Sequence, residues 1–166
     1  MSRKIAVTDY QSLAELRHQI RRFLHFSEQA ARAAGLEPRQ HQLLLALKGL
    51  PDGARPRVAE MAERLQIQHH STVELVNRLA ARGFVRRDRG GEDRREVLLS
   101  LTPKAHRVLQ ELSLHHKNEL ASAGPALVGA LRQVMRVHSS QEGAGCAQMR
   151  IMVSAFRSLQ LAAIRC

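Results

Sequence analysis

Aromatic side chains are scarce in this chain of 166 residues, which has no Trp, one Tyr and four Phe. Proteins that bind single-stranded nucleic acid usually stack the bases on such rings, so the scarcity argues against a single-stranded partner. Hydrophobic residues still make up 44% of the chain. Leu, Ala and Val must therefore fill the core, and this favours a fold of packed helices.

Long apolar runs are missing too. No stretch approaches the roughly 18 apolar residues of a membrane span, and residues 1–10 lack the apolar centre of a secretory signal. We therefore expect a cytoplasmic protein without a membrane partner. The two cysteines, Cys146 and Cys166, are too few and too widely spaced for a zinc ribbon. Two incidental reduced thiols are the favoured interpretation, with a redox-active pair as the alternative.

Motifs for metal binding and for common enzyme chemistry are absent as well. Four of the nine histidines form two adjacent pairs, at 69–70 and 115–116, which is a poor geometry for one metal site. There is no His-x-x-x-His motif with a glutamate partner, no Gly-rich phosphate loop and no Gly-x-Ser-x-Gly elbow. We therefore expect no metal, no other cofactor and no enzymatic activity.

Positive charge is what the chain has in excess. It carries 26 Lys and Arg against 15 Asp and Glu, for a net charge of +11. Each phosphate that a protein neutralises releases condensed counterions, so this excess favours a polyanionic partner. A membrane-surface helix would combine its basic face with a bulky apolar one, whereas the densest arginines here lie in a predicted hairpin. Duplex DNA is the favoured partner, and an acidic protein bound by an adaptor is the alternative.

Residues 57–83 predict two short helices joined by a tight turn. Apolar residues one helical turn apart define the first helix, and the turn falls over residues 66–70. The second helix is predicted to begin at Ser71, because Glu74 three residues later can complete a capping box. It is predicted to end at Gly83, a residue that tolerates a left-handed conformation. This arrangement is typical of a helix-turn-helix.

The second of these helices has an apolar and a polar side. Val73, Val76, Leu79 and Ala80 gather on the apolar side, with Thr72 and Leu75 at its border. A major groove admits such a helix, and residues near its N-terminus are best placed to reach base edges. The candidates for these contacts are His69, His70, Ser71, Thr72, Glu74, Asn77 and Arg78. For Ser71 and Glu74 the alternative is that they only cap the helix.

A β-hairpin is predicted over residues 84–101, where the apolar spacing shifts toward two and Gly90-Gly91 can form the tip. Arginines near such a tip project beyond the body of a domain and can enter a narrow minor groove. The candidate wing residues are Arg86, Arg87, Arg89, Asp93, Arg94 and Arg95. The whole indicates a mainly α fold with a small β-hairpin wing, a winged helix-turn-helix.

Further helices are predicted on both sides. The first runs from Thr8 or Asp9 to about residue 34, and its apolar stripe exceeds what one small domain can cover. The next begins at Pro38, with leucines facing inward and residues 40–42 facing outward. Thr102-Pro103 starts another, which Gly124-Pro125 interrupts. A last helix follows a polar break at residues 139–145.

These elements predict three parts of the chain. They are an N-terminal dimerisation helix at residues 1–35, a winged helix-turn-helix that binds DNA at 36–102, and C-terminal dimerisation helices at 103–166. An effector pocket is expected where the first helix, the second helix and the helix after Thr102 meet. His18, Arg22 and His25 are its candidates by position, and the alternative is that each is a surface residue.

Residues 69–85 resemble the recognition helix and first wing strand of MarR-type (multiple antibiotic resistance regulator) transcription factors. Asp93, Arg95, Leu101 and Thr102 fall on that family's wing pattern of Asp, any residue, Arg, five of any kind, Leu and Thr. The resemblance covers about residues 36–112. Many members have Thr-Arg where Val73-Glu74 stand here, so base preference does not carry over.

This resemblance implies a winged-helix homodimer on a pseudo-palindromic operator of double-stranded DNA. The usual arrangement in the family is a repressor that a small-molecule effector releases. Carried onto this chain, the resemblance implies that Arg95 and Arg94 approach the minor groove and that residues 71–78 read the major groove. Some members sense oxidants through cysteine, so a redox-sensing regulator that uses Cys146 or Cys166 is a further alternative.

Overall fold

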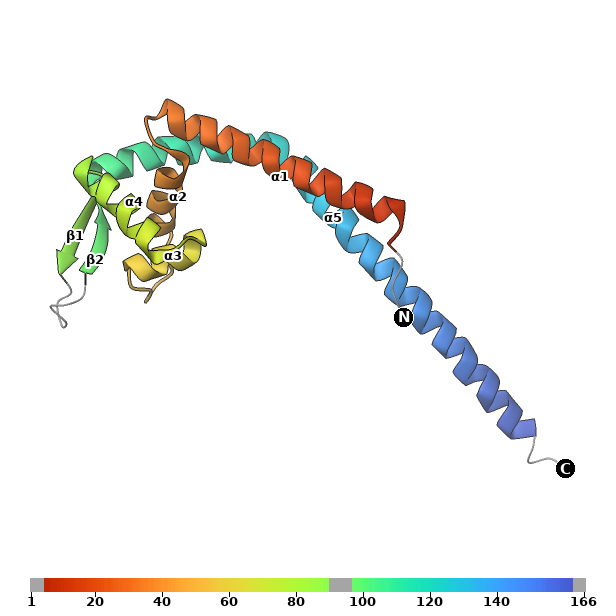
Figure 1. Ribbon diagram of the computed structural model, residues 1–166. Helices are drawn as coiled ribbons and strands as arrows, with labels where there is room; N and C mark the ends of the chain where they lie inside the picture. Colours follow the sequence, from red (N-terminus) through yellow and green to blue (C-terminus); the bar gives the residue numbers. More distant parts are fainter. Residues whose placement is uncertain (1–4, 90–96, 163–166) are drawn as a thin grey trace. The chain divides into compact units, whose positions relative to one another are not determined.

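The computed structural model describes residues 5–89 and 97–162, with side chains described up to residue 88 and from 97 to 136. This part of the chain is mainly helical with one small antiparallel sheet, which confirms the predicted fold class (Figure 1). In chain order the elements are α1 (Val7–Ala33), α2 (Pro38–Lys48), α3 (Val58–Leu65), α4 (His69–Ala81), β1 (Val85–Arg89), β2 (Val97–Leu101) and α5 (Pro103–Ala162). In the described ranges no helix is both long and apolar enough to cross a membrane.

The chain divides into two compact units, and both long helices take part in each. One unit joins the chain up to Arg22 with the chain from Ala123 onward, and the other spans Phe23–Ser122. The second unit holds the complete helix-turn-helix and the described strands of the wing. Its boundary in α5 lies directly before Gly124-Pro125.

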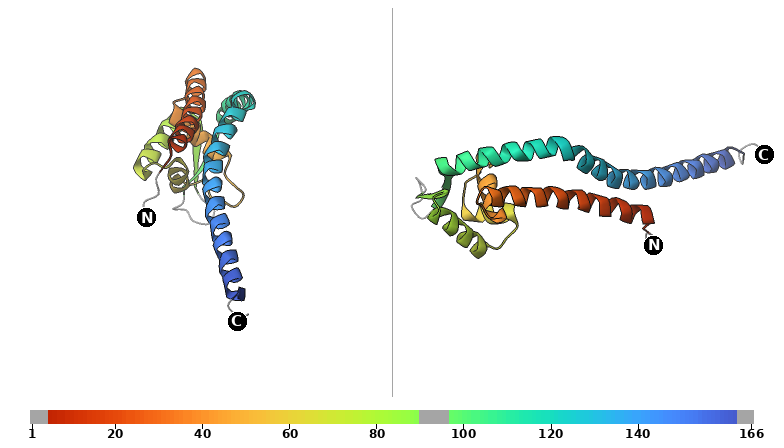
Figure 2. Two further views of the ribbon diagram at one scale, coloured as in Figure 1. Left: turned by 90° about the vertical axis from the view of Figure 1, so that its right-hand side faces the viewer. Right: turned by 90° about the horizontal axis from the view of Figure 1, so that it is seen from above.

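The core of the second unit draws on every helix and on both strands. Helix α2 contributes a stripe of leucines three or four residues apart, as the sequence predicts, and the other elements close around it. The buried apolar side chains are Ala31, Leu36, Leu43, Leu44, Leu47, Met61, Leu75, Val76, Leu79, Phe84, Val85, Leu99, Ala105, Leu109 and Leu112. Figure 2 shows the last part of α1 and the first part of α5 side by side, where Ser27 is hydrogen-bonded to His116.

The wing strands pair in antiparallel register, from Val85 opposite Leu101 to Arg89 opposite Val97. Alternate residues of a strand face opposite sides. The buried pair Val85 and Leu99 therefore fixes one face of the ribbon toward the core. The predicted tip, Gly90-Gly91, lies outside the described residues.

The recognition helix α4 begins at His69, so the predicted start at Ser71 with a capping box is wrong. Gln68 is the N-cap, and no side chain caps the helix there. The turn is short because Gln66 adopts a left-handed conformation, with φ 52° and ψ 44°, and reverses the chain directly after α3. Ser71 and Glu74 therefore lie within the helix.

The prediction that residues 40–42 face outward is wrong for two of the three. Gln40 is 5% exposed and His41 is 3% exposed. The Gln40 amide oxygen accepts hydrogen bonds from the Glu37 N–H and from the Arg82 guanidinium, and His41 stacks against His116. Buried polar groups are tolerated when they are paired in this way.

Helix α5 is continuous, so the breaks predicted at Gly124-Pro125 and at residues 139–145 are wrong. A proline inside a helix removes one N–H donor and crowds the preceding turn, which can bend the helix without ending it. The predicted start of α5 is confirmed, because Thr102 Oγ1 accepts the Ala105 N–H at 3.3 Å directly before Pro103.

Candidate DNA-binding surface

The exposed face of α4 carries most of the predicted base-contacting residues. His69, His70, Glu74, Asn77 and Arg78 are all exposed, and Ser71 is half-buried. Residues three or four apart share one face of a helix, so His70, Glu74, Asn77 and Arg78 form one surface, and His69 lies next to it in the first turn. The Glu74 carboxylate lies 3.8 Å from the Arg78 guanidinium, with 70% and 66% of the two side chains exposed. A pair so exposed is weak, so each partner can exchange the other for a base or a phosphate.

Thr72 does not belong to this surface, and the prediction that it contacts bases is wrong. Its side chain is fully buried, and its hydroxyl donates a hydrogen bond to the Gln68 carbonyl at 3.1 Å. The sequence predicted Val73 on the apolar side and Thr72 at its border, yet Val73 is only half-buried. The buried side is centred instead on Thr72, Val76 and Leu79.

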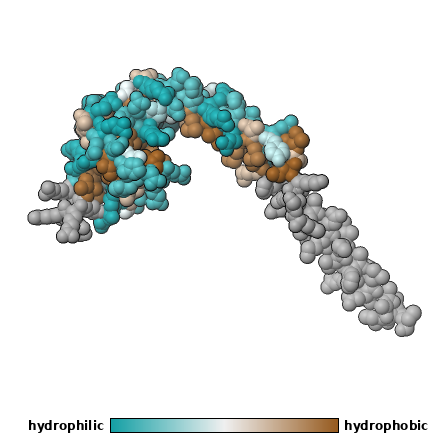
Figure 3. Space-filling view, in the orientation of Figure 1, coloured by the Kyte–Doolittle hydropathy of each residue, from teal (hydrophilic) through white to brown (hydrophobic). Residues whose placement is uncertain are grey.

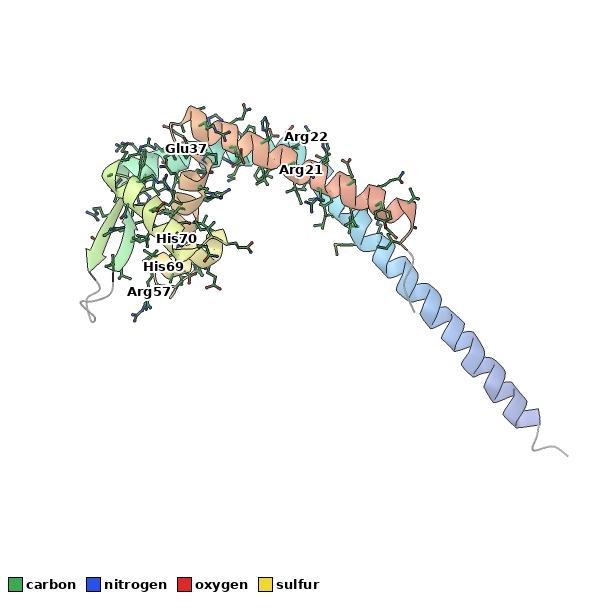
Figure 4. All side chains as sticks on the ribbon, in the orientation of Figure 1. Arg21, Arg22, Glu37, Arg57, His69 and His70 are labelled. Atoms are coloured by element: carbon green, nitrogen blue, oxygen red, sulfur yellow. The ribbon has the colours of Figure 1, made fainter. Side chains whose placement is uncertain are left out.

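Arg57 joins this surface although the sequence analysis did not single it out. It is the N-cap of α3 and is exposed. Figure 4 shows Arg57 beside His69 and His70 at one edge of the winged-helix unit. The signal in the sequence was the pair of arginines that flank Pro56, directly before the first helix of the motif.

The base of the wing is tied to α4 by a hydrogen bond. The Arg87 guanidinium on β1 donates through Nη2 to Asn77 Oδ1 on α4. Arg87 lies on the same face of the strand as Val85, the face that turns toward the core. On the opposite face, the Ser100 hydroxyl donates to the Asp88 carboxylate at 2.5 Å, and Arg86 is exposed. The Arg89 side chain, Asp93, Arg94 and Arg95 lie outside the described residues.

The other end of α4 is held by Arg82. Its guanidinium donates to Gln40 Oε1 at 2.8 Å and to the Gly35 carbonyl at 2.7 Å, and it lies 5.2 Å from the centre of the Phe84 ring. The Lys104 ammonium lies 4.4 Å from the same ring and donates to the Arg82 carbonyl at 3.0 Å. Arg82 therefore fixes the recognition helix to the turn between α1 and α2.

The side chains of His41 on α2 and His116 on α5 contact each other. Their ring centroids lie 5.0 Å apart, and Phe23 and Phe26 of α1 present their rings edge-on to His116. Burial, and then the neighbouring His116, lower the pKa of His41 from 6.5 to about 4. This pair could not be predicted from the sequence, because its two members lie far apart along the chain.

A groove of about 510 Å³ lies between α1 and α5 in the winged-helix unit. Alanines of α1 form an apolar wall, and Gln29, Glu111 and His115 supply polar groups. His25, one of the predicted pocket residues, lies at 2.9 Å from the Gln29 amide nitrogen. His18 and Arg22 are exposed residues of the other unit.

Large apolar side chains remain exposed on the unit formed by the start of α1 and the later part of α5. On α1 they are Val7, Tyr10, Leu13 and Ile20, and on α5 they are Val128, Leu131 and Met135. In Figure 3 brown, hydrophobic residues gather on the helices of this unit. The side chains of Cys146 and Cys166, the candidate redox pair, lie outside the described residues.

Comparison with known proteins gives matches at the level of sequence and of structure. Residues 34–96 match the MarR family. YfiV of Bacillus subtilis, an uncharacterized HTH-type transcriptional regulator, is 36% identical over 56 residues, which are 34% of this chain and 35% of YfiV. The match thus spans about a third of that relative.

Two solved structures are similar over most of the chain. AbsC, a MarR family transcriptional regulator from Streptomyces coelicolor, has a TM-score of 0.64 and 18% identity, over 86% of this chain and 99% of that chain. BpsR of Bordetella bronchiseptica, whose DNA binding is regulated by 6-hydroxynicotinic acid, has a TM-score of 0.55 and 23% identity, over 75% and 89%. Such identities show the fold alone. Residues 34–96 of this chain therefore match the MarR family in sequence, and the described chain shares the winged helix-turn-helix fold of these structures.

Proposed function

We propose that this chain is a homodimeric transcriptional regulator that binds a pseudo-palindromic site in double-stranded DNA. One observation carries the proposal: the exposed polar face of α4 and the base of the wing are joined directly, through Asn77 and Arg87. A helix that reads the major groove and a ribbon that reaches the adjacent minor groove must hold a fixed relation to each other. The Asn77–Arg87 bond supplies that relation.

In this arrangement α4 enters the major groove. His69, His70 and Ser71 at its start, with Glu74, Asn77 and Arg78 further along, face the base edges and nearby phosphates. Arg94 and Arg95 reach the minor groove, with Arg86 and Arg89 on the flanking strands. The exposed Arg57 contacts a backbone phosphate beside the start of α4.

Dimerisation follows from the exposed apolar side chains of the first unit. Seven large apolar side chains are exposed on its two helices. Packing against a helix of a partner chain would remove them from water. Two copies would place their recognition helices in successive major grooves, about 34 Å apart. Such a dimer requires a site with two-fold symmetry.

We further propose that the protein is a repressor and that a small effector releases it from DNA. The groove between α1 and α5 supports this, because it combines an apolar wall with a few polar groups, as ligand sites do. BpsR, which shares the fold, is regulated by a small molecule. His25 lies next to the groove, and a ligand held between the two helices would bias their spacing.

The test begins with selection of bound fragments from the source genome, followed by affinity measurements on the selected duplex over a range of salt. We expect a palindromic site and a steep loss of affinity with salt. Arg95→Ala should weaken binding to all sequences and reduce the salt slope by about one, whereas Glu74→Gln should change the preferred sequence. A chain that stays monomeric in sedimentation, or that ignores duplex DNA, would refute the proposal.

A further inference from the structure

The hydrogen bond between Arg87 and Asn77 determines how the asparagine amide is turned. Arg87 lies on the strand face that continues the buried face of Val85, and this directs its guanidinium back toward α4. There it donates to Asn77 Oδ1. A guanidinium has only donors, so the amide must present its oxygen to Arg87 whichever way the amide would otherwise turn.

This orientation leaves the amide NH₂ group of Asn77 as the end that is not held by the wing. Both side chains are exposed, so the NH₂ group and the remaining guanidinium N–H groups are open to a partner. All of these groups are donors. Arg87 occupies one of the two lone pairs of the amide oxygen, so donors outnumber the remaining acceptor site on this small surface.

An asparagine that reads adenine uses both ends of its amide, with the oxygen accepting from adenine N6 and the nitrogen donating to N7. That mode needs the oxygen turned to the base edge, whereas here Arg87 occupies one of its two lone pairs and turns it toward the wing. Acceptors match the pair better, and duplex DNA offers them as guanine N7 and O6 or as phosphate oxygens.

We propose that Asn77 and Arg87 act as one contact that mainly donates hydrogen bonds, in which Arg87 is a positioning residue that turns the NH₂ group of Asn77 toward a hydrogen-bond acceptor of the DNA. The inference rests on the proposed function and adds to it the chemistry that this position selects. It assigns Arg87 a different task from that of the arginines near the tip of the wing. Adenine is disfavoured at the position that Asn77 faces.

The decisive variant is Asn77→Asp. An aspartate keeps an oxygen for Arg87, so the tie between wing and helix survives, but it replaces the NH₂ donor by a charged acceptor. The matched control is Asn118→Asp at the chain's other asparagine, which is exposed on α5 in the same unit. Both variants change the net charge equally, so the control accounts for the overall charge, and the modified duplexes described below separate the lost donor from local repulsion by the new carboxylate.

The measurement is the affinity of each protein for the tightest duplex selected from a randomised pool by the wild-type chain. We expect Asn77→Asp to weaken binding at least about tenfold and Asn118→Asp less than about twofold. Unchanged thermal midpoints for both variants will show that the fold is intact. If Asn77→Asp binds the duplex as tightly as the control does, the inference is wrong while the proposed function stands. If the wild-type chain binds no duplex, both fail.

Two further arms identify the acceptor and test the positioning role. Replacing single guanines by 7-deazaguanine, or single phosphates by methylphosphonate, should weaken the wild type at one position and leave Asn77→Asp unaffected there. A double-mutant cycle with Asn77→Ala and Arg87→Ala should show strong non-additivity, because each residue acts through the other. Additive losses, or no modified position that depends on Asn77, would overturn the inference.

Discussion

The rings of His41 and His116 lie 5.0 Å apart in a tilted stack, and each ring nitrogen of His116 has a hydrogen-bond partner. Its Nδ1 lies against the Leu112 carbonyl, which can only accept, so Nδ1 carries the hydrogen. Its Nε2 lies 2.7 Å from the hydroxyl oxygen of Ser27 on α1. The His116 ring is therefore held from both sides, by α5 and by α1, against the buried His41.

The first prediction concerns the dependence of stability on pH. The pKa of His41 falls from 6.5 to about 4 in the fold, so the unfolded chain takes up the proton first as the pH falls. Stability is therefore full above pH 6.5 and is lost as the pH falls toward 4. Between pH 7 and pH 5 this one group should lower the free energy of unfolding by about 2 kcal/mol, measured by urea denaturation.

His41→Phe isolates this contribution from that of the other histidines. The variant keeps an aromatic ring at the position and removes the titrating group. We expect its free energy of unfolding to vary less with pH than that of the wild type, by the same amount of about 2 kcal/mol. Parallel curves for the two proteins would contradict the prediction.

The second prediction concerns Arg82, which holds the end of α4 against the turn after α1. Arg82→Ala removes hydrogen bonds to Gln40 and to the Gly35 carbonyl and leaves the buried Gln40 amide with one partner fewer. We expect a loss of about 1–3 kcal/mol in the free energy of unfolding. The control is Arg78→Ala on the same helix, whose exposed pair with Glu74 should contribute less than about 0.5 kcal/mol. Equal losses of unfolding free energy in the two variants would show that Arg82 does not hold the end of α4 in place.

The third prediction concerns the N-cap of α5. Thr102 Oγ1 accepts the Ala105 N–H and donates to the Gly83 carbonyl at 2.8 Å, so this hydroxyl joins α5 to the end of α4. Thr102→Val keeps the shape of the side chain and removes both bonds. We expect a loss of about 1–2 kcal/mol, read from the urea midpoint, whereas Thr102→Ser should retain most of the stability.

Local signals explain which parts of the fold could be predicted from the sequence. Pro38 begins α2, Thr102 caps α5, and Gly35 and Gly83 follow helices with φ near 70°, each through chemistry within a few residues. The wing strands followed from their apolar alternation in the same way. Signals of this kind depend only on neighbouring residues, so a sequence displays them directly.

The predictions that were wrong concern contacts between residues far apart in the sequence, or small free-energy differences that nearly cancel. Gln40 looked like a surface residue because its partner Arg82 lies 42 positions away, and His41 because its partner is on α5. Thr72 looked polar, yet its hydroxyl is satisfied within its own helix, so burial costs little. In the site, the exposed face of α4 was largely predictable, whereas the bond between Asn77 and Arg87 depends on how the strand is turned.

The last prediction concerns Gln66, the residue that ends α3 and misled the placement of α4. Its φ of 52° lies in the left-handed region, which costs a residue with a Cβ about 1–2 kcal/mol. Gln66→Gly should therefore raise the free energy of unfolding by about 0.5–1 kcal/mol, the strain relief being offset in part by the greater freedom of glycine in the unfolded chain. Gly83→Ala is the matched opposite change, because Gly83 has a φ of 71° with open space around a Cβ, so its expected loss of about 1 kcal/mol reports backbone strain alone. Urea denaturation of both variants checks the pair, and a Gln66→Gly protein less stable than the wild type would mean that the glutamine side chain stabilises this turn by more than its backbone strains it.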